Sequence, residues 1–214
     1  MSVIEIKGVS KTFKDRELFD DINLSIGEGV IVGITGENGC GKSVLFKMIC
    51  GFTGFKGEIK VFSKSIGKDV DVPENTGIII ETPGFLEEYD QVYNLKYLSS
   101  INKKMSDDEI RNILTKVGLD PDNKQKVRKF SLGMRQKLAI AQAIMEDQKL
   151  IILDEPMNAL DSDSVENVRA ILKELKKEGK TIIIASHIKE DIDCLCDEVY
   201  RIKNKKLEKV SVDK

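Results

Sequence analysis

The chain has 214 residues, enough for one α/β domain or for one domain with a small inserted subdomain. Hydrophobic residues make up 41% of it and charged residues 33%, which excludes an intrinsically disordered protein. The net charge of −2 gives no general attraction to nucleic acid, and every apolar run is far shorter than the roughly 18 residues of a membrane-spanning helix. Residues 1–15 lack the apolar core of a signal peptide, so we expect a cytoplasmic protein unless a partner holds it at a membrane.

Strand patterns dominate the first third of the chain. Residues 3–7 alternate and residues 24–26 follow a turn, so both are predicted as antiparallel edge strands. Residues 30–34 are continuously apolar, which is typical of a strand buried on both faces of a parallel sheet. A glycine-rich turn and a helix over about 42–50 follow, and residues 57–62 predict another short strand.

The middle of the chain changes from strand patterns to helix patterns. Residues 63–75 are polar and are predicted as a surface loop, and residues 77–80 are predicted as a second buried strand. Helical periodicity then predicts helices over 94–102, 106–117 and about 131–146. A capping box opens the second of these helices, and a serine is placed to cap the third.

Strand patterns return in the last third of the chain. Residues 150–153 and 181–185 are predicted as strands, separated by a helix over 162–178, and residues 198–210 are predicted as two short strands. This order indicates a parallel-sheet core interrupted by a helical insertion. Four cysteines without C-x-x-C spacing and a single histidine indicate reduced thiols rather than a structural metal site.

A phosphate-binding loop is predicted between the strand at 30–34 and the next helix. The sequence Gly36-Glu-Asn-Gly-Cys-Gly-Lys-Ser43 fits the pattern Gly-x4-Gly-Lys-Ser, whose backbone N–H groups converge on phosphate oxygens. Lys42 is expected to bridge the β- and γ-phosphates, and the Ser43 hydroxyl to ligate Mg²⁺. Cys40 is either simply a small residue or, as an alternative, a thiol whose oxidation blocks nucleotide binding. The predicted nucleotide-binding residues of this segment are Gly36, Glu37, Asn38, Gly39, Cys40, Gly41, Lys42, Ser43 and Val44.

Two acidic residues follow the strand predicted at 150–153. Ligands bind at the carboxyl ends of strands in α/β sheets, so we expect Asp154 and Glu155 beside the phosphate loop. Asp154 is expected to hold Mg²⁺ through water, and Glu155 to polarise the attacking water as general base. An acidic pair after a strand is weak evidence alone, and its combination with the phosphate loop makes it specific.

These motifs resemble the ATP-binding subunits of ABC transporters over essentially the whole chain. The resemblance also rests on Ser131-Leu-Gly-Met134, Asp154-Glu-Pro156, Asn158-Ala-Leu-Asp161 and Ser186-His187. It implies that Ser131 and Gly133 contact the ATP held by a second subunit, that Asp161 shapes that opposite site, and that His187 contacts the γ-phosphate. Phe13 matches the aromatic residue that stacks on adenine, although an aromatic side chain near an edge strand by itself more often only packs.

Two departures from the usual motifs indicate which branch of the family the chain resembles. The signature reads Phe130-Ser-Leu-Gly-Met134 in place of Leu-Ser-Gly-Gly-Gln, and Glu81 in Ile80-Glu-Thr-Pro-Gly84 replaces the usual glutamine. Both look like the bacitracin and lantibiotic-immunity branch of ABC exporters. We hypothesise that Glu81 contributes to Mg²⁺ or water positioning and transmits the nucleotide state to a permease.

The resemblance implies one α/β ABC ATP-binding domain over residues 1–214. It has a P-loop NTPase (RecA-like) core with an N-terminal antiparallel β-subdomain and an inserted helical subdomain. We expect residues 1–87 and 148–214 to form the nucleotide-binding core and residues 88–147 the helical subdomain. The helical insertion around residues 85–102 is the expected surface for docking a permease.

The implied function is Mg²⁺-dependent ATP hydrolysis that powers a separate integral-membrane permease. Two such subunits, as a homodimer or heterodimer, would close around two ATP molecules at the inner face of the cell membrane. The subfamily resemblance favours export of a peptide antibiotic or a similar amphiphile. An alternative is a non-transport dimerisation switch that regulates a soluble partner. A small-molecule phosphotransferase is a third interpretation, but it leaves residues 131–134 and 158–161 unexplained.

Overall fold

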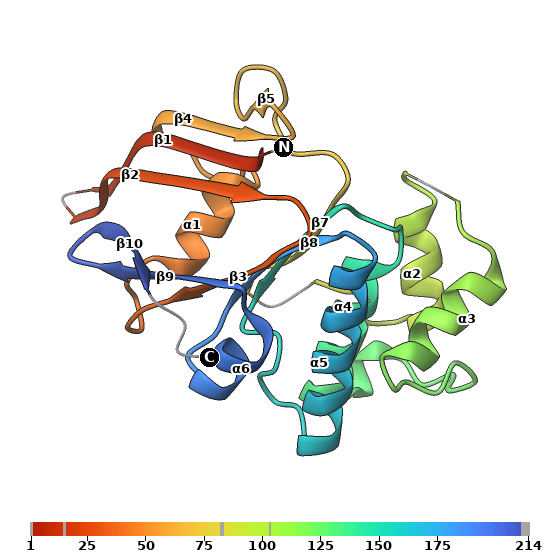
Figure 1. Cartoon of the computed structure of the whole chain (residues 1–214). Coiled ribbons are helices and arrows are strands. Elements are labelled where there is room, and N and C mark those ends of the chain that lie inside the picture. The colour runs from red at the N-terminus through yellow and green to blue at the C-terminus, as the bar shows by residue number, and fades with distance from the viewer. Residues whose placement is uncertain (1, 15, 82–83, 103, 211–214) are drawn as a thin grey trace.

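The computed structural model describes residues 2–14, 16–81, 84–102 and 104–210. Its strands form one antiparallel sheet with the order β2-β1-β4-β5 and one mainly parallel sheet with the order β10-β9-β3-β8-β7-β6. Helices lie on both faces of the larger sheet (Figure 1). The α/β fold predicted from the sequence, with an N-terminal antiparallel sheet, is therefore confirmed.

The antiparallel sheet is larger than predicted. Its strands are β1 (Ser2–Phe13), β2 (Arg16–Gly27), β4 (Lys56–Val61) and β5 (Lys64–Ser65). The prediction of two edge strands is correct for β2 but wrong for β1, which pairs with β2 on one side and β4 on the other. Residues 4–6 of β1 pair with β2 and with β4 at once, so β1 is an interior strand of this sheet. The prediction of a loop over residues 63–75 is wrong at Lys64 and Ser65, which form β5 and pair with β4.

The larger sheet carries the strands that lead into the phosphate loop and the acidic pair. It consists of β3 (Ile31–Thr35), β6 (Thr76–Ile79), β7 (Leu150–Asp154), β8 (Thr181–Ala185), β9 (Glu198–Lys203) and β10 (Lys206–Val210). β3 lies between β8 and β9 in parallel register, and β10 runs antiparallel to β9. The predicted second buried strand is the sheet edge β6, where Ile79 is buried but Ile78 is only half-buried.

Six α-helices are described besides a short 3-10 turn at Val127–Lys129. They are α1 (Lys42–Ile49), α2 (Gln91–Ser99), α3 (Asp107–Lys116), α4 (Leu132–Ile144), α5 (Ser162–Lys177) and α6 (Lys189–Leu195). The capping box of α3 and the Ser131 cap of α4 are confirmed. α2 begins three residues before the predicted 94–102, because the Asp90 side chain accepts a hydrogen bond from the Tyr93 N–H and caps the helix there.

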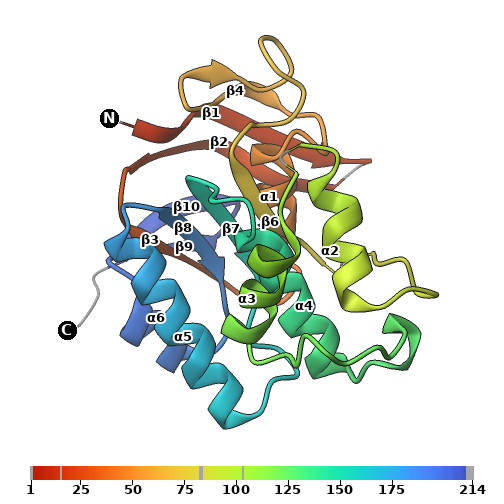
Figure 2. The ribbon, with the colours of Figure 1, turned by 90° about the vertical axis from the view of Figure 1, so that its right-hand side faces the viewer.

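The helices divide into two layers around the larger sheet. α1 shares an apolar core with the antiparallel sheet and one face of the larger sheet, while α2 to α6 share a second core on the opposite face. Figure 2 shows α5 and α6 lying beside each other on that face. In the described part of the chain, no helix is both long and apolar enough to cross a bilayer. The predicted division at residues 88 and 147 stays a prediction.

Candidate nucleotide site

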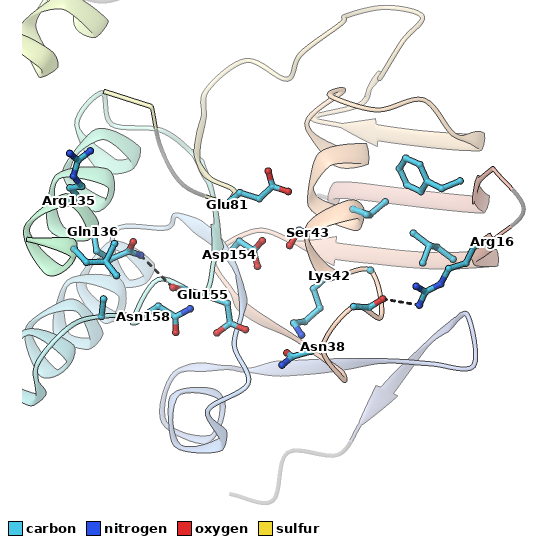
Figure 3. A pocket seen from close by; sticks show the side chains of 17 residues that line it. Arg16, Asn38, Lys42, Ser43, Glu81, Arg135, Gln136, Asp154, Glu155 and Asn158 are labelled. Atoms are coloured by element: carbon cyan, nitrogen blue, oxygen red, sulfur yellow. Dashed lines mark hydrogen bonds between the residues drawn. The ribbon is translucent and has the colours of Figure 1, made fainter. Parts of the chain in front are cut away.

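A cavity of about 730 Å³ lies where β3 and β7 end, between the antiparallel sheet and α4 (Figure 3). Its position at the carboxyl ends of parallel strands is where α/β sheets bind ligands. Its lining residues come from the two sheets, the phosphate loop with the start of α1, the segments that follow β6 and β7, and α4. They are Phe13, Arg16, Leu18, Asn38, Gly39, Gly41, Lys42, Ser43, Val44, Glu81, Leu132, Arg135, Gln136, Asp154, Glu155, Asn158 and Ala159.

The phosphate loop connects β3 to α1 and carries a lysine folded back over it. Lys42, only 8% exposed, donates from Nζ to the carbonyl oxygens of Gly36 at 3.0 Å and Glu37 at 3.4 Å. Gly41 has φ +114°, and a Cβ there would come within 2.8 Å of the Phe19 ring, so glycine is required at this turn. α1 begins without a side-chain cap, which leaves the N–H groups of its first turn available to an anion.

Asp154 and Ser43 face each other across the cavity floor. Burial raises the pKa of the Asp154 carboxyl, and a hydrogen bond from the Ser43 hydroxyl partly opposes that rise. A hydroxyl and a carboxylate are oxygen ligands of the kind that Mg²⁺ accepts beside phosphates. No cluster of three acidic, histidine or cysteine side chains suited to a metal ion occurs among the described residues. These two donors therefore fit a Mg²⁺ ion whose remaining ligands come from a nucleotide, and not an ion coordinated by protein side chains alone.

Glu155 and His187 meet beside the phosphate loop. His187 Nδ1 lies 2.8 Å from Glu155 Oε2, and because a carboxylate accepts hydrogen bonds, Nδ1 donates, while Nε2 has no hydrogen-bond partner among the described residues. The Glu155 N–H donates to the Ala185 carbonyl at 2.9 Å, which joins the ends of β7 and β8. His187 itself lines a second cavity of about 1230 Å³, together with Gly36, Glu37 and Cys40 of the phosphate loop. The Glu155–His187 contact thus lies between the two cavities.

A buried ion pair supports the loop that carries His187. Arg169 on α5 donates to Asp191 Oδ1 from Nε at 3.0 Å and from Nη2 at 2.5 Å. The Ser186 hydroxyl donates to Asp191 Oδ2 at 3.2 Å, and the Ile188 N–H donates to the Ser186 hydroxyl at 3.1 Å. Asp191 therefore fixes the residues on either side of His187. No local pattern in the sequence marks Arg169 or Asp191, so neither was predicted.

Glu81 lines the cavity but its carboxylate is directed to a lysine. Glu81 Oε1 accepts from Lys47 Nζ on α1 at 2.5 Å, and Figure 3 shows its side chain turned away from Asp154. The Thr82-Pro83 part of its motif lies outside the described residues. A role of Glu81 toward Mg²⁺ stays a prediction.

The signature residues and Asp161 lie at the α4 side of the molecule. Leu132, 67% exposed, lines the cavity, whereas Ser131 and Gly133 are not among its lining residues. A Cβ on Gly133 would come within 2.8 Å of the Ala159 carbonyl oxygen, so the signature turn packs closely on residues 158–161. Asp161 accepts from the Ser164 N–H at 2.9 Å and caps α5, which lowers its pKa. Contacts of these residues with a second subunit stay predictions.

Phe13 and Arg16 border the outer end of the cavity. Phe13 is 45% exposed, as the residue that stacks on a base must be. Arg16 Nη2 donates to the Gly39 carbonyl at 3.4 Å and ties the antiparallel sheet to the phosphate loop. Gln136 Nε2 donates to the Pro156 carbonyl at 2.9 Å and holds α4 to the segment after Glu155. Neither Arg16 nor Gln136 belongs to one of the motifs above, so neither was predicted.

Comparison with known proteins finds one family, both by its family model and among similar proteins. The model of a family described as ABC transporter matches residues 19–158. The chain is 42% identical over 207 residues to an uncharacterized ABC transporter ATP-binding protein, YybJ, of Bacillus subtilis (strain 168), covering 96% of this chain and 95% of that protein. It is 34% identical to the bacitracin transport ATP-binding protein BcrA of Enterococcus faecalis, covering 92% of this chain but 65% of that protein. It is 33% identical to the lantibiotic transport ATP-binding protein SrtF of Streptococcus pyogenes, covering 91% and 84%.

Solved structures share the fold along nearly the whole chain. The structure of an ATP-binding subunit of an ABC transporter matches with a TM-score of 0.88 and 25% identity, covering 99% of this chain and 90% of that one. A dimeric ATP-binding cassette in a post-hydrolysis state with ADP and Pi matches with a TM-score of 0.87 and 22% identity, covering 99% of both chains.

Proposed function

Because this chain belongs to the ABC transporter family as one of its ATP-hydrolysing subunits, we propose that it powers a permease carried on a separate chain. The observation that carries the proposal is that Lys42, the Ser43–Asp154 pair and Glu155 line one cavity, with His187 hydrogen-bonded to Glu155 at its border. These are the parts that phosphoryl transfer to water needs: a cationic cradle, a metal-binding pair and a base.

In the proposed reaction, Lys42 releases its two loop carbonyls and binds the β- and γ-phosphates. Glu155 accepts a proton from the attacking water, and the hydrogen bond from His187 Nδ1 orients its carboxylate for that role. His187 Nε2 is then free to contact the γ-phosphate. Ser43 and Asp154 would hold Mg²⁺, which when bound neutralises charge on the phosphoryl group.

The nucleotide site is proposed to be completed by a second copy or a related subunit. Ser131 caps α4 through the Met134 N–H, and the positive end of that helix suits an anion. Leu132 beside it is exposed, and Gly133 packs on the backbone of Ala159. Residues 131–134 and 158–161 therefore form one edge that can reach the γ-phosphate held by a partner.

We further propose that the permease docks against a groove of about 470 Å³ between β6, α2 and α4. Phe52 and Ile101 line this groove and are 55% and 72% exposed. Exposed apolar side chains at a groove are typical of an interaction surface. Docking there would hold the chain at the inner face of the cell membrane. The relatives named for bacitracin and lantibiotic transport support a peptide antibiotic or similar amphiphile as the exported cargo.

Dimer formation is tested with Glu155→Gln, which should bind Mg-ATP without hydrolysing it. Size-exclusion chromatography with light scattering should show a monomer alone and a dimer with Mg-ATP. The matched control, Glu155→Gln with Lys42→Ala, should stay monomeric because it lacks the phosphate-binding lysine. A Glu155→Gln protein that binds ATP and remains monomeric would contradict closure by two copies alone.

Permease docking is tested by membrane co-purification of a tagged chain expressed in its host. Ile101→Asp should abolish recovery of a polytopic membrane protein while the purified variant retains ATP hydrolysis. Val72→Asp is the control, because Val72 is also exposed, at 46%, but lies outside the groove.

Cargo is tested by deleting the gene and measuring growth with bacitracin and with a lantibiotic. Sensitivity that the wild type restores and Glu155→Gln does not is the expected result.

A further inference from the structure

A lysine stands against one face of the Phe13 ring. Lys11 and Phe13 are two residues apart near the end of β1, where the strand has a register shift between Lys11 and Thr12. Lys11 Nζ is 4.3 Å from the centroid of the Phe13 ring, within the range of a cation–π contact. The same ammonium group donates to Thr53 Oγ1 at 2.8 Å and to the Gly54 carbonyl, both in the loop that follows α1.

The ammonium charge of Lys11 is left to act on the ring. Both of its hydrogen-bond acceptors are neutral oxygens, and no ion pair to Lys11 occurs among the described residues. Lys7, on the same strand, has its charge paired with Glu5 at 3.0 Å. A cation over one face of an aromatic ring is attracted to its negative quadrupole, which restrains the ring and leaves the opposite face for a second planar group.

We propose that Lys11 is a positioning residue for the nucleotide base, acting through Phe13. The inference rests on the proposed function and on the stacking of adenine on Phe13 that the family resemblance implies. Lys11, held by Thr53 and Gly54, fixes the ring and presents its free face to the cavity that Phe13 lines. The electron-poor ring that results stacks better on an electron-rich purine.

The test compares ATP with inorganic tripolyphosphate, which offers similar phosphates and no base. Isothermal titration with Mg²⁺ gives Kd for both ligands. Lys11→Met keeps the alkyl stem and removes the charge, so it should weaken ATP binding about two- to fivefold, the equivalent of an exposed cation–π contact. Tripolyphosphate binding should not change. Lys11→Arg should restore ATP binding, and Lys7→Met should leave both ligands unaffected.

The outcomes separate this inference from the proposal that it rests on. If Lys11→Met weakens ATP and tripolyphosphate equally, Lys11 only supports the fold and the inference is wrong. If Phe13→Ala weakens ATP selectively and Lys11→Met does not, Phe13 stacks on the base without help from Lys11. If Phe13→Ala leaves the ratio of the two Kd values unchanged, the stacking itself is wrong. In a Phe13→Ala background, Lys11→Met should have no further effect on ATP.

Discussion

Replacing Asp191 by Ala should destabilise the protein more than any substitution of an exposed acidic residue. The Asp191 side chain is 1% exposed and that of Arg169 is 9% exposed. The change removes two hydrogen bonds from Arg169 and one from Ser186. Breaking a buried ion pair from one side typically costs about 3–5 kcal/mol, because the remaining charge stays buried.

The expected loss lies at the lower end of that range. Arg169 Nη1 keeps its contacts with Glu166 at 2.6 Å and Glu190 at 3.1 Å, and both glutamates are largely exposed. A loss of about 3 kcal/mol in a chain of this size lowers the melting temperature by about 6–12 °C. Because Asp191 also holds Ser186, the loop that carries His187 should loosen and turnover should fall with it.

Thermal unfolding followed by circular dichroism measures the effect, with Asp193→Ala as the matched control. Asp193 lies in the same helix but its contact with Lys189 is 4.0 Å long and exposed, so it should contribute less than about 1 kcal/mol. The double variant Arg169→Met with Asp191→Leu removes both charges and should recover most of the stability. Equal melting temperatures for Asp191→Ala and Asp193→Ala would refute the reasoning.

Three further predictions follow from single contacts. Gly133→Ala should lose about 1–3 kcal/mol in urea unfolding, because its Cβ would lie 2.8 Å from a carbonyl oxygen, whereas Gly84→Ala, with open space, should not. Burial raises the pKa of Cys50 to about 12, so at about pH 8 alkylation followed by mass spectrometry should label exposed Cys194 and spare Cys50 until unfolding. Ser106→Ala should cost about 1 kcal/mol by removing the capping box of α3, and Ser106→Asp should restore it.

Local signals in the sequence were enough to predict much of the fold. The continuous apolar run of β3, the capping box at Ser106 and the cap at Ser131 depend on neighbouring residues, and the structure confirms them. The length of β1 was underestimated, because its second half is held mainly by pairing with β2, and register shifts there interrupt the alternation that marks a strand. The start of α2 was misplaced because Asp90 was not recognised as a cap.

In the candidate site too, only the residues that belong to local motifs could be predicted from the sequence. The phosphate loop and the Asp154-Glu155 pair have fixed spacing in the chain, so they could be found, and the predicted resemblance to the bacitracin and lantibiotic branch is confirmed by the relatives. The Arg169–Asp191 pair and the Lys11 contact depend on segments brought together only by folding. The partner of Glu81, Lys47, lies 34 residues away in the chain and could not be read from either motif.

The close contact between Gly133 and Ala159 has a genetic consequence. In the proposed dimer, each nucleotide site combines the phosphate loop of one chain with the edge that contains this contact from the other chain. When a Lys42→Ala chain pairs with a Gly133→Ala chain, both defects therefore fall in the same one of the two nucleotide sites. The other site combines an unchanged phosphate loop with an unchanged edge, so two defective alleles expressed together should complement each other.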